Sequence, residues 1–129
     1  MAKIVDNTVL DAALMKIQGY PIAVTPANTQ MFVCSTQPTT YAEASTTYML
    51  AAKTAIPSTD YAIADGTSGR RLTTTQYSGV SITNTGSAQH IAICNASVLL
   101  YVTTCTAQTI NSGGTVTIPS WYIELADPT

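Results

Sequence analysis

Charged side chains are scarce in this chain of 129 residues, since lysine, arginine, aspartate and glutamate together make up only 9% of it. An ordinary soluble domain carries about 25%. The formal net charge is −2, and the basic residues are scattered, at Lys3, Lys16, Lys53, Arg70 and Arg71. A nucleic-acid-binding protein needs a basic stripe that displaces counterions. The composition therefore argues against a nucleic-acid partner.

Long hydrophobic runs are also missing. The longest, Val98 to Val102, is far too short to cross a bilayer. Near the N-terminus, Asp6 and Asp11 interrupt any apolar segment of the kind that a signal peptide needs. We therefore expect no membrane partner, and a chain that is made and first folds in a cytoplasm.

Residues that carry chemistry are few. A catalytic site needs nucleophiles, acids and bases within reach of one another, and the single histidine, His90, falls within a predicted strand. His90 could form a dyad with Cys34 or Cys94, but no protease signature surrounds these residues. No spacing joins the three carboxylates that turns and helix ends leave unexplained, Glu43, Asp60 and Glu124. Cys-x-x-Cys pairs and calcium loops are absent as well, so the sequence predicts no catalytic, metal or cofactor site.

The cysteines are odd in number, at Cys34, Cys94 and Cys105. A cytoplasmic origin disfavours disulfides, which leads us to expect three small, buried, hydrophobic side chains. A bond between two of them, or to a neighbouring subunit, is the alternative.

The residues that are abundant favour β-structure. Hydrophobic residues make up 46% of the chain, and threonine occupies 23 positions. Threonine is β-branched and prefers strands to helices. The length fits a single domain, residues 1–129. Because a weakly charged surface opposes association less, the composition suits a protein that packs against neighbours, although an extracellular β domain can look the same.

One amphipathic helix is predicted, over Asp6 to Gln18. Asn7 or Thr8 can cap it, and Thr8 with Asp11 fits a capping box. Gly19 and Pro21 stand where the helix should stop. Its apolar face comprises Val9, Leu10, Ala13, Leu14 and Ile17. This face can pack on the domain's own sheet or dock on a neighbouring subunit.

The rest, residues 20–126, is predicted to be a β domain. The pattern favours strands at 30–35, 46–56, 71–76, 80–84, 88–94, 98–104 and 121–125, and a hairpin of 107–110 with 115–118. Residues 57–69 contain several turn signals and are predicted to be largely loop. The fold class that follows is mostly β: an antiparallel β-sandwich or barrel of about seven to nine short strands with one N-terminal α-helix.

Five segments, taken together and in order, resemble a family of small virion-associated proteins of tailed bacteriophages. They are residues 10–14, 34–44, 68–72, 88–93 and 123–128. The chain departs from that family at Ile91, where an aromatic residue is expected after the histidine. The resemblance implies no active-site residues. It implies a head decoration or cement protein that binds the major capsid protein in a virion assembled in the bacterial cytoplasm.

We expect such a protein to be a homo-oligomer, with a trimer as one arrangement. A tail, neck or fibre-base component is the alternative, and a β module that binds glycans or a host surface through Trp121 and the tyrosines is the second alternative. The candidate interface residues are Val9, Leu10, Ala13, Leu14, Ile17, Tyr61, Arg70 and Arg71.

Overall fold

The computed structural model describes residues 4–18, 29–95 and 97–129. Within them a helix, α1 (Asn7–Ile17), precedes a series of strands. The strands are β1 (Thr29–Cys34), β2 (Met49–Ile56), β3 (Tyr61–Asp65), β4 (Arg70–Thr74), β5 (Tyr77–Ser81), β6 (Gly86–Asn95), β7 (Val98–Ile110), β8 (Thr115–Ile118) and β9 (Tyr122–Leu125). A π-helical turn, Glu43–Thr47, precedes β2, and a 3-10 turn, Ser58–Asp60, precedes β3.

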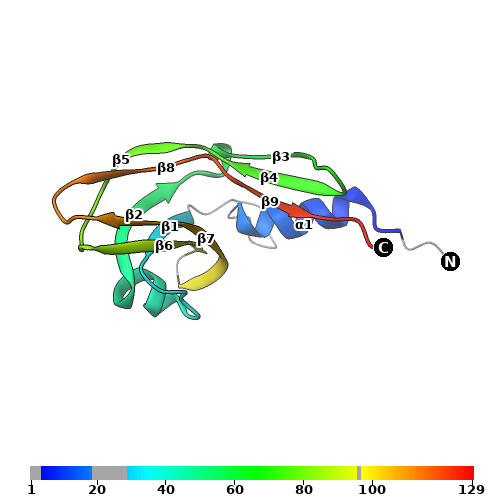
Figure 1. The fold of residues 1–129 in the computed structure, drawn as a ribbon. Coiled ribbons are helices and arrows are strands. Elements are labelled where there is room, and N and C mark those ends of the chain that lie inside the picture. The colour runs from blue at the N-terminus through cyan, green and yellow to red at the C-terminus, as the bar shows by residue number, and fades with distance from the viewer. Residues whose placement is uncertain (1–3, 19–28, 96) are drawn as a thin grey trace.

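Two layers form the body of the molecule (Figure 1). One is an antiparallel four-stranded sheet in the order β2-β1-β6-β7. The other is a long ribbon in which the pair β5-β8 is followed by the sheet β3-β4-β9, and the N–H of Thr74 donates to the carbonyl of Trp121 where the two parts meet. Helix α1 lies beneath the β3-β4-β9 part. The predicted fold, mostly β and antiparallel with an N-terminal helix, is confirmed.

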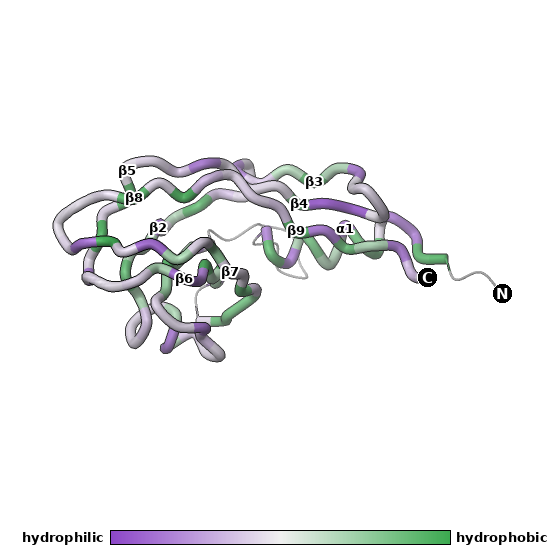
Figure 2. Tube along the Cα trace, in the orientation of Figure 1, coloured by the Kyte–Doolittle hydropathy of each residue, from purple (hydrophilic) through white to green (hydrophobic). Residues whose placement is uncertain are grey.

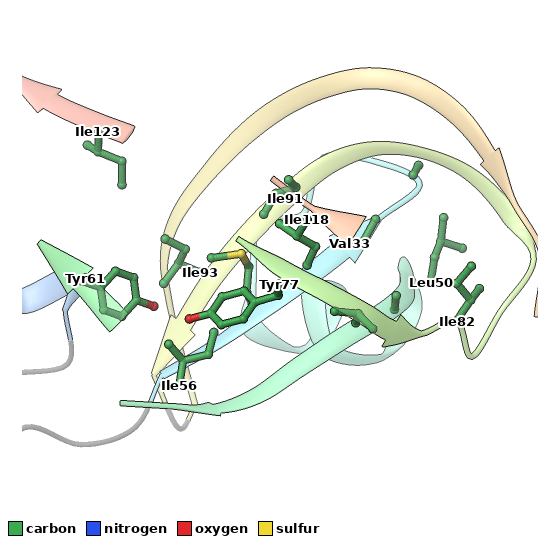
Figure 3. Close-up of a cluster of buried hydrophobic side chains, with 14 of the residues drawn as sticks. Val33, Leu50, Ile56, Tyr61, Tyr77, Ile82, Ile91, Ile93, Ile118 and Ile123 are labelled. Atoms are coloured by element: carbon green, nitrogen blue, oxygen red, sulfur yellow. The ribbon is translucent and has the colours of Figure 1, made fainter. Parts of the chain in front are cut away.

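The main core lies between the four-stranded sheet and the ribbon (Figure 3). The sheet contributes Val33, Ile91 and Ile93, and the ribbon contributes Tyr77 and Ile118. Each of these side chains is at most 9% exposed. Burying an aliphatic side chain of this size stabilises a fold by roughly 1.5–3 kcal/mol, so the contact between the layers is the main source of stability.

A second cluster covers the other face of the four-stranded sheet. It contains Phe32, Cys34, Ala92 and Cys94, with Ala44 from the π-helical turn packed against them. Strand β1 is therefore buried on both faces. This is why its sequence is continuously apolar from residue 31 to 34 rather than alternating.

The ends of α1 differ in detail from the prediction. Asp6 is the N-cap, and its carboxylate accepts the N–H of Thr8 at 2.8 Å. The predicted caps, Asn7 and Thr8, lie inside the helix, and the capping box is wrong because Asp11 pairs with Arg70 instead. Gly19 and Pro21 lie outside the described residues.

Two predictions about the strands are wrong. Residues 57–69 are not a loop, because Tyr61–Asp65 forms β3 and pairs with β4. Residues 107–110 and 115–118 do not form a hairpin: residues 98–110 are one strand, and β8 pairs with β5 in the ribbon. At the turn, Gly113 has φ of 90° and donates its N–H to the carbonyl of Ile82. Glycine alone adopts this left-handed backbone conformation easily, and it lets the chain cross from the sheet to the ribbon.

Candidate interaction surface

The predicted apolar face of α1 is divided between the core and the surface. Leu14 is completely buried in the main core, and Leu10 and Ile17 are half-buried. Val9 is 58% exposed, and Ala13 is also exposed. The helix therefore packs on its own domain, and only the Val9 and Ala13 side of the predicted face is open to another molecule.

Polar contacts explain why the buried face of α1 is rotated from the predicted one. The guanidinium of Arg70, on β4, lies 2.5 Å from the carboxylate of Asp11. The side-chain amide of Gln18 donates to the carbonyl of Ser58 at 2.8 Å. Both contacts turn the Asp11 and Gln18 side of the helix toward the ribbon, and Val9 turns away with the opposite side.

Of the other candidate interface residues, Tyr61 lies in the core. It is 5% exposed, and its hydroxyl shares a hydrogen bond with Thr29. Arg70 contacts a second carboxylate, that of Asp65, in addition to Asp11, and its side chain is 17% exposed. Tyr61 and Arg70 therefore serve contacts inside the domain.

Arg71 belongs to a second ion pair at the same end of the ribbon. Its guanidinium lies 2.7 Å from the carboxylate of Glu124 and 3.9 Å from the ring centroid of Tyr122. Two hydrogen bonds hold the pKa of Glu124 below its usual value: the one from the N–H of Ser68 has the larger effect, and the one from Arg71 the smaller. Tyr122 is 54% exposed, so Arg71 supports an aromatic ring that remains accessible.

The register of β1 with β6 places Cys34 opposite His90. The Cys34 thiol is buried, and it donates toward the carbonyl of Ala44 at 3.6 Å. Burial raises the pKa of Cys34 to about 12 and that of Cys94 to about 11. Because the thiolate is the nucleophile, these thiols are poorly suited to attack a substrate. All three cysteines, including the partly buried Cys105, are free.

A groove opens between β7 and the segment that links β8 to β9. Its larger part has a volume of about 750 Å³ and is lined by Ile91, Thr103, Thr104, Cys105, Thr106, Pro119, Ser120, Trp121 and Tyr122. A narrower part, of about 210 Å³, shares four of these residues and extends to Gln108 and Val116. Trp121 stacks on Tyr101, with ring centroids 6.0 Å apart. Its indole N–H is buried and has no hydrogen-bond acceptor among the described residues.

The groove belongs to a part of the chain that carries no charge. Between Arg71 and Glu124 stand 52 residues without a single lysine, arginine, aspartate or glutamate. They include all of β5, β6, β7 and β8. In Figure 2 the longest strongly hydrophilic stretch of the ribbon lies at β4, which begins with the two arginines. None of the eight candidate interface residues lines the groove, whereas Trp121, named from the sequence for the glycan-binding alternative, lies there. The uncharged stretch was a signal that could have pointed to the groove.

Within residues 4–18, 29–95 and 97–129, no three histidine, cysteine, aspartate or glutamate side chains come close enough to hold a metal ion. In the same part of the chain, no helix has the length and apolar character needed to span a membrane. No family model, curated protein or solved structure matches the chain.

Proposed function

We propose that this chain is a non-enzymatic structural protein of a tailed-phage particle, which binds the major capsid protein and stabilises its lattice as a decoration or cement protein. The observation that carries the proposal is the uncharged stretch of 52 residues. It forms half of the ribbon and half of the four-stranded sheet. Surface charge keeps proteins apart in solution, and a protein that stays in contact with neighbours has less need of it.

The resemblance of five segments to virion-associated proteins supplies the identity of the partner. A decoration protein contacts many identical subunits, so that weak individual contacts add up through multivalency. Threonine-rich strands offer hydroxyl and methyl groups for such contacts without the desolvation penalty of buried charge. The location that follows is the virion, after assembly in the bacterial cytoplasm.

The direct test is the copy number of the chain in purified phage particles, measured by quantitative mass spectrometry against the major capsid protein. A ratio near one to one, or one to three, is expected for a layer over the head lattice. A few to a few dozen copies would instead assign the chain to the tail, neck or fibre base. Complete absence from the particle would refute a virion role.

A pair of charge variants tests whether the uncharged region makes the contact. Thr115→Glu places a carboxylate on β8, and Thr59→Glu places one outside the uncharged stretch; both threonines are exposed. Binding to expanded capsids, measured by co-sedimentation, should fall for Thr115→Glu and stay unchanged for Thr59→Glu. Equal binding by both variants would place the contact elsewhere, and no binding by the wild-type chain would reject the decoration role.

The groove favours one other function, glycan binding, because it combines the rings of Trp121 and Tyr122 with threonine and serine hydroxyls. Aromatic faces and hydroxyl groups are what sugars contact. Titration with a glycan panel, followed by tryptophan fluorescence, tests this function. Trp121 is the only tryptophan, so a saturable change would report on the groove, and no change across the panel would reject the alternative.

A further inference from the structure

The strands at the edges of the sheets are protected to very different degrees. An exposed edge presents unpaired N–H and C=O groups that can pair with another chain, and proteins guard such edges with short strands and charged side chains. Strand β3 has five residues and includes Asp65, β9 has four and includes Glu124, and β2 includes Lys53. These edges follow the usual rule.

Strand β7 does not follow it. β7 has 13 residues, lies at the end of the four-stranded sheet, and contains no charged residue, proline or glycine. Its partner is β6, and among the described residues no backbone hydrogen bond reaches its other side. Val98, the first residue of β7, is hydrophobic and 54% exposed. β7 is thus the longest strand, and neither shortness nor charge protects its edge.

Irregularities in the pairing of β7 with β6 show which part of this edge is regular. Register shifts occur opposite Ala88–His90 and opposite Ile93–Cys94. Between them, Tyr101 to Thr104 pairs with β6 residue by residue. A strand that joins the edge would find its best-formed hydrogen-bonding groups along these four residues, with Val102 and Thr103 at the centre.

We propose that β7 pairs with β7 of a second copy of this chain, antiparallel and about a two-fold axis, so that two four-stranded sheets become one. The inference goes beyond the capsid contact and does not depend on it. In an isologous contact the same patch meets itself, and an axis perpendicular to the sheet sets one residue opposite its own copy. A charge near that axis would face the same charge, which destabilises a cross-strand pair.

The absence of charge along β7 is what such a self-pairing requires, whereas a strand that binds a different partner can carry charges that the partner neutralises. The threonines near the centre add to this, because cross-strand threonine pairs are favourable. The second strand would also lie at the mouth of the groove beside Pro119 and Trp121. In this proposal the free protein is a two-fold dimer, whereas the sequence led us to consider a trimer.

Disulfide trapping tests the pairing at its centre. In a Cys105→Ser background, Val102→Cys or Thr103→Cys would set a cysteine opposite its copy. Antiparallel neighbours have Cα atoms roughly 4.5 or 5.5 Å apart, and both distances suit a disulfide. Mild oxidation should give a linked dimer, twice the 13.6 kDa of one chain, for at least one of the two variants. Val98→Cys is the control: it is more exposed than Val102 and Thr103 but lies far from the axis, and it should stay unlinked.

The second measurement is the mass of the unmodified protein in solution, by light scattering coupled to size exclusion. A dimer is expected for the wild type, a monomer for Thr103→Lys, and a dimer for Thr109→Lys, which adds the same charge beyond the irregular stretch. The proposal would be overturned if the wild-type protein were a monomer in solution and neither cysteine variant gave a disulfide-linked dimer. A dimer or trimer that Thr103→Lys leaves intact would also overturn it. Because these measurements use the free chain, their failure is distinguishable from failure to bind capsids.

Discussion

Leu14 gives the clearest test of how α1 is used. Its side chain is completely buried in the main core, and α1 contacts both β4 and β6. Leu14→Ala removes three buried carbon atoms and leaves a cavity, which typically costs 2–5 kcal/mol. Because a helix that covers one end of the domain can shift to fill part of the space, we expect about 2–3 kcal/mol.

The loss can be measured by urea and thermal unfolding of the isolated protein. For a domain of this size, each kcal/mol lowers Tm by roughly 3–5 °C, so Tm should fall by about 10 °C. Val9→Ala is the control on the same helix. Since Val9 is 58% exposed, its truncation should change the free energy of unfolding by no more than about 0.5 kcal/mol.

The reverse pattern would refute the placement of α1. If Leu14→Ala left the free energy of unfolding unchanged but abolished binding to capsids, the helix would be docking on a neighbour and not on its own domain. Equal effects of Leu14→Ala and Val9→Ala on unfolding would likewise contradict the division of this face between core and solvent.

Three further predictions concern a turn, a thiol and a carboxylate. Gly69→Ala should lower stability to urea more than Gly79→Ala: both have positive φ, which costs other residues about 1–2 kcal/mol, but only at Gly69 would a Cβ meet a backbone oxygen, at 2.0 Å. Equal losses would contradict this. A thiol reagent should label Cys105 in the native protein well before Cys34, which is fully buried; labelling at one rate would contradict that burial. The pKa of Glu124 is below its usual 4.5 in the folded state, so as the pH falls the unfolded chain takes up this proton first. Its contribution to stability is therefore present above about pH 4.5 and is lost progressively as the pH falls from there through the folded-state pKa. Glu124→Gln should flatten the acid side of a plot of urea midpoint against pH, whereas an unchanged slope would contradict the shift.

The sequence predicts most elements of this fold because their signals are local. The apolar run at residues 31–34 gives β1, and the helical spacing of Leu10, Leu14 and Ile17 gives α1. The strands from residue 70 onward are visible because glycine, asparagine and serine stand between them. Each of these patterns acts within a few residues and does not depend on what lies across the sheet.

Pairing and exposure could not be predicted, because both depend on residues that are distant in sequence. Tyr61–Asp65 is short and surrounded by turn residues. It becomes a strand because its backbone pairs with that of β4. Strand β8 does not form the predicted hairpin with residues 107–110, because it pairs with β5 in the ribbon instead. The face of α1 that is buried was predicted only in part, since an ion pair with Arg70, 59 residues away, sets the rotation of the helix.

The position of the charges indicates where a partner should be sought. Arg70 and Arg71 use their charge within the domain, where they tie the β3-β4-β9 part of the ribbon together and hold α1 beneath it. Paired charges of this kind are already satisfied and offer little to an incoming protein. The strands from β5 to β8 have no such contacts, and one of them ends the sheet with an open edge. We therefore expect substitutions that break association to fall on β7 and β8, and not on the two arginines that the sequence first pointed to.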